Sequence, residues 1–235
     1  MLAEPREVLS EETEASVRPR VTLHFAQTLD GRIATRTGSA RWISGPAATR
    51  FAHELRAGAG AVIIGSGTAL ADDPLLTVRL VEGRQPIRVV LDARARLSAS
   101  AKLVTDASAP TIHVTRSPDR RPLAPHVEPW CLPPDPDGVG VDLEALLARL
   151  GARGVTQVLV EGGGCVITAF LRRRLADRII VTVAPMILGR GVDAVGDLGI
   201  ERLDQALRFA PVRVFSLGDD VLIELVPRRS PELSA

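Results

Sequence analysis

Short runs of β-branched and other apolar residues recur along this chain of 235 residues, and they restrict its possible folds more than any other feature. Each run has the length and the residue types of a β-strand. Segments with a helical period separate several of the runs, and strands that alternate with helices form mainly parallel sheets. The sequence therefore predicts an α/β protein with a mainly parallel central sheet flanked by helices. The predicted strands span residues 21–25, 61–65, 87–91, 111–114, 155–160, 178–184, 211–217 and 220–226.

Three segments have the apolar period and the end signals of helices. They span residues 44–57, 141–154 and 165–177. Ser44 and Asp142 are the predicted N-caps of the first two, because both side chains can accept a hydrogen bond from a free backbone N–H. Arginines lie in the last turns of the third, where positive charge favours the helix dipole.

Turn and loop signals divide the rest of the chain. Gly218-Asp219 joins the last two predicted strands, which indicates an antiparallel hairpin that closes the sheet. Residues 117–140 hold seven of the 17 prolines and are predicted to form an irregular surface connection. The start of the chain is rich in glutamate and lacks the features of a signal peptide. We therefore expect a flexible acidic tail over 1–19, one domain over 20–227, and a short tail over 228–235.

Composition excludes several classes of partner. The net charge of +1 gives no electrostatic reason to bind nucleic acid or an anionic membrane, and aromatic residues amount to only 3%. No apolar run approaches the roughly 20 residues of a membrane span. The two cysteines, Cys131 and Cys165, belong to no CxxC pair, so we expect no metal site and a reducing, cytoplasmic location.

Two glycine-rich segments directly follow predicted strands. Glu161-Gly162-Gly163-Gly164 precedes a predicted helix, whose N-terminal N–H groups and partial positive charge suit a phosphate. The alternative is a glycine turn that only allows tight packing. Gly65-Ser66-Gly67 is half of a dinucleotide fingerprint, but Leu70 stands where the third glycine would be. Together the two segments could bind one extended ligand with phosphates, such as a dinucleotide.

Arg94 and Arg96 follow the predicted strand 87–91. Two interpretations stay open. They are either solvated surface arginines or they bind the ribose 2′-phosphate that distinguishes NADP from NAD.

Seven motifs in a fixed order resemble the reductase domain of bacterial riboflavin-biosynthesis enzymes, which has the dihydrofolate-reductase-like fold. The resemblance extends over residues 20 to 227. The motifs are TLDGRIA (28–34), RWIS (41–44), LRA (55–57), GTALADDPLLTVR (67–79), QPIRVVLD (85–92), VEGGG (160–164) and APMILGRG (184–191).

This resemblance implies an NADPH-dependent oxidoreductase that is a cytoplasmic homodimer. Its substrate would be 5-amino-6-(5-phosphoribosylamino)uracil or the 2,5-diamino pyrimidinone counterpart. Hydride would reach C1′ of the ribose and give the ribitylamino product. The zinc deaminase signature of bifunctional relatives, H-x-E with P-C-x-x-C, is absent from this sequence.

The resemblance also implies the residues of the site. The cofactor-binding residues would be Trp42, Thr68, Asp72, Ala93, Arg94, Gly163, Gly164, Cys165, Val166, Ile167, Thr168 and Ala169. The substrate-binding residues would be His24, Arg56, Leu76, Arg79 and Glu161. Arg56 and Arg79 suit a phosphate because a guanidinium donates two parallel hydrogen bonds. Glu161 suits a ring N–H or a sugar hydroxyl.

Two positions depart from the family pattern, and both lie on the substrate side. His24 stands where the family has a lysine, and Ala40 where it has a serine. His24 is a candidate proton donor, and the alternative is a packed strand histidine. The departures leave open two other functions. One is a reductase of the same fold acting on another pyrimidine or pterin-like substrate, and the other is a nucleotide-binding homologue without catalysis.

Overall fold

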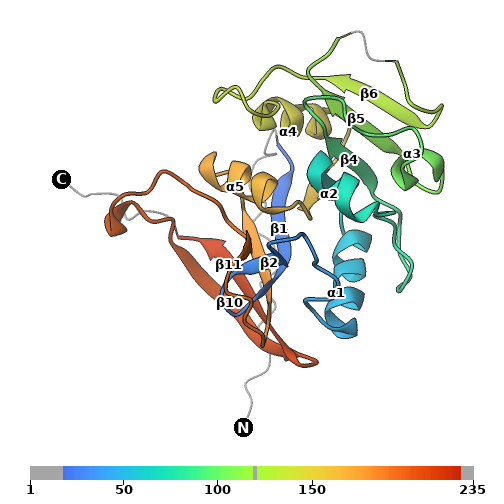
Figure 1. Cartoon of the computed structure of the whole chain (residues 1–235). Helices are drawn as coiled ribbons and strands as arrows, with labels where there is room; N and C mark the ends of the chain where they lie inside the picture. Colours follow the sequence, from blue (N-terminus) through green and yellow to red (C-terminus); the bar gives the residue numbers. More distant parts are fainter. Residues whose placement is uncertain (1–17, 119–120, 229–235) are drawn as a thin grey trace.

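A nine-stranded sheet runs through the computed structural model, which describes residues 18–118 and 121–228 (Figure 1). Its strands are β1 (Arg20–Thr28), β3 (Ala61–Gly65), β4 (Ile87–Leu91), β5 (Thr111–Thr115), β6 (Val127–Cys131), β7 (Gln157–Val160), β8 (Arg178–Ala184), β10 (Phe209–Leu217) and β11 (Asp220–Pro227). They are ordered β10-β11-β8-β1-β7-β3-β4-β5-β6. All neighbours from β8 to β6 are parallel, whereas β11 pairs antiparallel with both β8 and β10.

Helices cover both faces of this sheet. They are α1 (Pro46–Ala57), α2 (Ser66–Asp72), α3 (Lys102–Thr105), α4 (Leu143–Ala152) and α5 (Gly164–Arg172). Side chains of α4 and α5 pack into the larger core cluster on one face. Side chains of α1, α2 and α3 pack on the smaller cluster on the other. Among the described residues, no helix combines the length and the apolar character that crossing a bilayer requires.

The apolar run of β3 shows why the sheet has two cores. Ala61 and Ile63 belong to the larger cluster, whereas Val62 and Ile64 belong to the smaller one. Successive side chains of a strand point to opposite faces, so a strand covered on both faces is apolar at every position.

The predicted parallel sheet and C-terminal hairpin are confirmed, and so is one of the two N-caps. The Asp142 carboxylate accepts hydrogen bonds from the N–H groups of Glu144 (2.9 Å) and Ala145 (3.0 Å) at the start of α4. The prediction for Ser44 is wrong, because the N-cap of α1 is Gly45, one residue later, which has no side chain to accept a hydrogen bond. Pro46 occupies the first turn instead, where its fixed φ suits a helix and its missing N–H costs nothing.

Other elements differ from the sequence prediction. The strand β6 lies inside the proline-rich segment that was expected to be irregular, and it tolerates Pro129 because it is an edge strand of the sheet. Residues 65–67 do not form a turn, since α2 begins at Ser66. A second sheet, made of β2 (Arg32–Thr35) and β9 (Gly191–Asp193), was not predicted.

An irregular segment, residues 73–80, follows α2, and side chains from other elements hold its path. The Asp73 carboxylate accepts a hydrogen bond from the N–H of Lys102, and the carbonyls of Leu75 and Leu80 accept from the side chains of Arg88 and Arg50. The side-chain amide of Gln85 binds both the N–H and the carbonyl of Val78, and the Arg79 N–H donates to His53. Buried or half-buried backbone groups need such partners where no strand or helix supplies them. Residues 73–80 are therefore ordered without regular secondary structure.

Candidate active site

Two cavities open beside the carboxyl ends of β3 and β7 and share part of their walls. We call the first, of about 500 Å³, the His24 cavity. The second, of about 660 Å³, is the Arg94 cavity. The residues common to both are Gly65, Gly67, Gly164, Cys165, Val166 and Val192. Carboxyl ends of parallel strands are where α/β proteins usually bind ligands.

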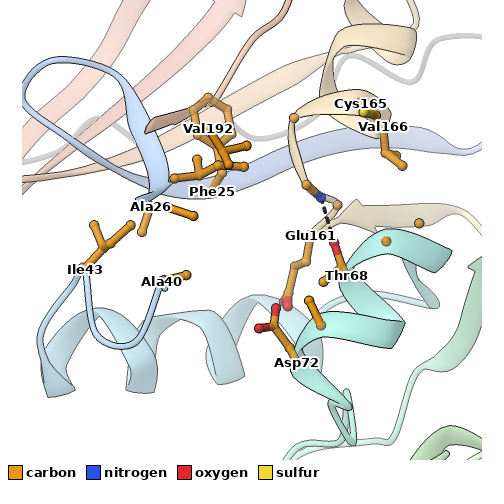
Figure 2. Close-up of a pocket in the computed structure, with 18 of the residues that line it drawn as sticks. Phe25, Ala26, Ala40, Ile43, Thr68, Asp72, Glu161, Cys165, Val166 and Val192 are labelled. Atoms are coloured by element: carbon orange, nitrogen blue, oxygen red, sulfur yellow. Dashed lines mark hydrogen bonds between the residues drawn. The ribbon is translucent and has the colours of Figure 1, made fainter. Parts of the chain in front are cut away.

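The His24 cavity has one apolar wall and one polar wall (Figure 2). Phe25, Ala26 and Ile43 lie on the apolar side, and Val192 from β9 adds to it. The opposite wall carries Thr68, Asp72 and Glu161, which come from α2 and the end of β7. Ala40 and Trp42 also line this cavity, and Trp42 is 75% exposed. A flat ring could therefore lie between an apolar face and a set of hydrogen-bonding groups.

The glycine turn before α5 leaves backbone N–H groups free. Thr68 Oγ1 accepts from the Gly163 N–H (3.0 Å), and the N–H groups of Gly164 and Cys165 have no acceptor within the described part of the chain. Such groups at a helix N-terminus suit a phosphate. The packing interpretation is also supported, since a Cβ on Gly162 would lie 2.6 Å from Val166. The glycines thus serve close packing and leave donors open to a ligand.

The Arg94 cavity contains both arginines that follow β4. Ala93, Arg94 and Arg96 line it, together with Ser66 at the start of α2. Arg94 is exposed, and Arg96 donates to Ser66 Oγ at 2.7 Å. Thr168 and Ala169 of α5 complete the opposite side. The part of this cavity at Arg94 and Arg96 can therefore bind an anion, whereas other parts of its wall carry the carboxylates of Asp135, Asp137, Asp193 and Asp197.

The loop with Arg94 and Arg96 is fixed from inside the protein by Asp92. Its fully buried carboxylate accepts from the Leu97 N–H (2.8 Å) and lies 3.0 Å from His113 Nε2. Burial raises the pKa of Asp92, but the hydrogen bonds from His113 and from the Arg96 and Leu97 N–H groups outweigh it and lower the pKa to about 2. Asp92 is therefore a structural carboxylate, held in its charged form.

Arg56 and Glu161 form a bidentate ion pair beside the His24 cavity. Arg56 Nε and Nη2 donate to the two Glu161 oxygens at 2.8 and 2.6 Å, and both side chains are more than four-fifths buried. The sequence prediction placed them separately, with Arg56 on a phosphate and Glu161 on the ring or sugar. In the structure only Nη1 of Arg56 stays outside this pair, and Glu161 lines the cavity. Arg56 therefore orients Glu161.

His24 lies in the same cluster. It is 8% exposed, lines the cavity, and its Nε2 has no hydrogen-bond partner within the described residues. Burial lowers the pKa of His24. The negative charge of Glu161 raises this pKa, the positive charge of Arg56 lowers it, and the net shift is downward. The imidazole is thus neutral at pH 7, and its Nε2 is a buried nitrogen that lacks a partner among the described residues.

Arg79 lies beyond the Arg56–Glu161 pair, in an exposed position. It is not among the residues that line the His24 cavity. Its Nη1 donates to Thr77 Oγ1 at 2.6 Å, and its backbone N–H donates to His53 Nδ1 at 3.0 Å. His53 was missed from the sequence, although its position three residues before Arg56 places both on the same face of α1.

Two predicted site residues have buried side chains. Leu76 is 3% exposed and packs in the smaller core, and Ile167 is fully buried in the larger one. Neither side chain can touch a ligand in this conformation, because both point into apolar packing. Within the described ranges, no three His, Cys, Asp or Glu side chains are grouped as metal ligands.

Comparisons with known proteins show to which family the sequence is related. The family model described as the RibD C-terminal domain matches residues 19–223. The chain is 39% identical over 220 residues to the 2,5-diamino-6-ribosylamino-4(3H)-pyrimidinone 5′-phosphate reductase of Methanothermobacter thermautotrophicus, covering 88% of this chain and 98% of that protein. It is 38% identical over 210 residues to the riboflavin biosynthesis protein RibD of Aquifex aeolicus, covering 88% of this chain and 57% of that protein.

Solved structures give the same relationship. A Thermotoga maritima diaminohydroxyphosphoribosylaminopyrimidine deaminase/5-amino-6-(5-phosphoribosylamino)uracil reductase superposes with a TM-score of 0.78 at 35% identity, covering 90% of this chain and 57% of that one. The chain thus spans little more than half of the longer relatives. A dihydrofolate reductase from Enterococcus faecalis superposes at a TM-score of 0.50 and 14% identity, over 89% of this chain and 97% of that one. This likeness concerns the fold alone and confirms the dihydrofolate-reductase-like prediction.

Proposed function

This chain belongs to the family of the RibD C-terminal domain, and on that basis we propose that it is an NADPH-dependent pyrimidine reductase of riboflavin biosynthesis. Its substrate is 5-amino-6-(5-phosphoribosylamino)uracil or the 2,5-diamino pyrimidinone counterpart. Reduction at C1′ of the ribose gives the ribitylamino product.

The observation that carries this proposal is the shared wall between the two cavities. Gly164, Cys165 and Val166 line both, so a dinucleotide in the Arg94 cavity would reach the His24 cavity at its nicotinamide end. Its phosphates would meet the free N–H groups of Gly164 and Cys165. The ribose C1′ of the substrate would then lie in the same cavity as the nicotinamide, as direct hydride transfer between two bound reactants requires.

Bound NADPH would supply the hydride, and the side chains of this protein have positioning tasks. Asp72 accepts hydrogen bonds from the nicotinamide end of the cofactor, and Thr68 fixes the glycine turn through Gly163. Glu161, oriented by Arg56, accepts from the pyrimidine ring or the sugar. Arg79 binds the 5′-phosphate beyond that pair.

In this proposal His24 donates a hydrogen bond to the substrate rather than a proton, because its ring is neutral at pH 7. Its neutral ring and unpaired Nε2 suit a group that donates one hydrogen bond to the substrate. The lysine that the family carries at this position would donate as a cation. We therefore propose that His24 contacts the ribose side of the substrate.

Turnover with a defined substrate tests the proposed function. We expect NADPH oxidation, followed at 340 nm, only when the phosphoribosylamino pyrimidine is present, with a product two mass units heavier than the substrate. A pterin of the same ring size is the control substrate. Oxidation with the pterin alone would point to the other heterocycle reductase, and NADPH binding without any turnover would contradict an enzyme.

Cofactor preference gives a prediction for Arg94 and Arg96. Replacing both with glutamine is expected to lower kcat/KM for NADPH about 10- to 100-fold, because a 2′-phosphate loses two guanidinium partners. The value for NADH should change less than threefold. Arg20→Gln, an exposed arginine at the start of β1, is the matched control. An equal loss with both cofactors would show that these arginines do not recognise the 2′-phosphate.

We also propose that the protein is a cytoplasmic homodimer that associates through β10. This strand is an edge of the large sheet, and Val212 and Val214 on it are 52% and 60% exposed. An apolar edge strand favours pairing with a second copy.

A further inference from the structure

A buried histidine outside both cavities holds the backbone of Arg79. His53 lies on α1 and is 3% exposed. Its Nδ1 accepts the hydrogen bond of the Arg79 N–H at 3.0 Å. His53 lines neither the His24 nor the Arg94 cavity. In the described part of the chain, its hydrogen bond to the candidate site is the one with the Arg79 N–H.

The hydrogen bond requires one form of the imidazole ring. Nδ1 accepts only when it carries no proton, so the ring is neutral with its proton on Nε2. Burial lowers the pKa of His53, and the charges of Arg56 and Arg79 lower it further against the opposing effect of Glu161. The surroundings of His53 thus keep Nδ1 an acceptor at neutral pH.

Arg79 is fixed at three points. His53 fixes its N–H, Gln85 brackets the preceding Val78 through two hydrogen bonds of 2.8 Å, and Thr77 Oγ1 accepts from its guanidinium at 2.6 Å. A guanidinium that is already oriented loses less side-chain entropy when it binds an anion. Of these three contacts, that of His53 lies on the backbone of Arg79 itself.

We propose that His53 is a positioning residue for substrate affinity, which presents Arg79 to the phosphate of the substrate. This inference rests on the proposed role of Arg79 as the phosphate ligand. His53 takes no part in proton or hydride transfer. Its loss should therefore raise KM for a phosphorylated substrate and leave kcat almost unchanged.

Isosteric variants test this role. In His53→Asn the amide oxygen can replace Nδ1 as acceptor, whereas in His53→Gln the amide group reaches the position of Nε2. We expect His53→Gln and His53→Ala to raise KM for the phosphorylated pyrimidine about tenfold with kcat within twofold. His53→Asn should stay within about threefold of the wild-type KM. The comparison of Asn with Gln stays decisive if the alanine variant does not fold.

A substrate without the 5′-phosphate is the second control. For the ribosylamino pyrimidine that lacks this group, all three variants should show the KM that the wild-type protein has for the same substrate, because Arg79 then has no phosphate to bind. The inference is overturned if Asn and Gln behave alike, or if KM of the dephosphorylated substrate rises equally. Arg79→Ala separates this failure from failure of the proposed phosphate site. If Arg79→Ala leaves KM unchanged, the proposed role of Arg79 is wrong, and the inference falls with it.

Discussion

Replacing Arg79 with alanine is expected to raise KM for the phosphorylated pyrimidine about 100-fold, the largest effect on binding that we predict. Charge-assisted hydrogen bonds are each worth roughly 1.5–3 kcal/mol, and a guanidinium offers a phosphate two of them. Within residues 18–118 and 121–228, Arg79 Nη1 donates to Thr77 and its Nε and Nη2 have no acceptor, so they can bind a phosphate. The dissociation constant of NADPH, measured by isothermal titration calorimetry, should change less than twofold.

Two further variants show whether the Arg79 effect comes from its geometry or only from its charge. Arg79→Lys keeps the positive charge but loses the planar fork, and we expect an intermediate rise of KM, about tenfold. Arg20→Gln removes an exposed arginine elsewhere and should leave KM unchanged. Equal losses of affinity for substrate and for NADPH in Arg79→Ala would contradict the assignment of Arg79 to the substrate phosphate.

Replacing Glu161 with glutamine is expected to have the largest combined effect, on stability and on activity together. The variant leaves the Arg56 guanidinium mostly buried without a carboxylate, and breaking such a pair costs about 3 kcal/mol. The same change removes the acceptor that we assign to the pyrimidine or sugar, so kcat/KM should fall at least about 100-fold. Urea unfolding and steady-state kinetics measure the two effects separately.

A double variant separates the two roles of the Arg56–Glu161 pair. Replacing a buried ion pair with apolar residues of similar volume is often neutral for stability. Arg56→Met combined with Glu161→Leu should therefore recover most of the free energy of unfolding lost in Glu161→Gln, while kcat/KM stays as low as in that variant. Activity restored along with stability would show that Glu161 serves only the fold.

The sheet could be predicted because most of its strands are runs of apolar residues that are visible in the sequence. The runs at β3 and β4 are apolar at every position or nearly so, which reflects helices on both faces. The short β2 and β9 lack such a signal, because three or four residues at a cavity rim need no core face. The prolines of residues 117–140 indicated an irregular segment, so β6 was not predicted. The glycines on either side of Ser66 do not favour a helix, so the start of α2 was not predicted. Local residue preferences were overridden there by the surrounding fold.

The candidate site could be predicted as a set of residues but not as a set of contacts. The family pattern selects Arg56 and Glu161 individually, yet 105 positions separate them along the chain, and only the fold reveals their ion pair. Leu76 is a residue that the family pattern selects but whose side chain does not reach the site. It lies within a motif, but motif membership does not say where a side chain points, and Leu76 points into the core.

Side chains outside the segment hold much of the path of residues 73–80, together with the Asp73 carboxylate and the buried Leu76 of the segment itself. Arg50, His53, Gln85 and Arg88 bind its backbone, which any amino acid except proline would present in the same way. A library randomised at the two exposed positions, Arg79 and Leu80, would therefore vary the chemistry offered to a substrate while keeping the route of the chain. Transplanting the segment into another reductase, by contrast, would succeed only if these four partners were transferred with it.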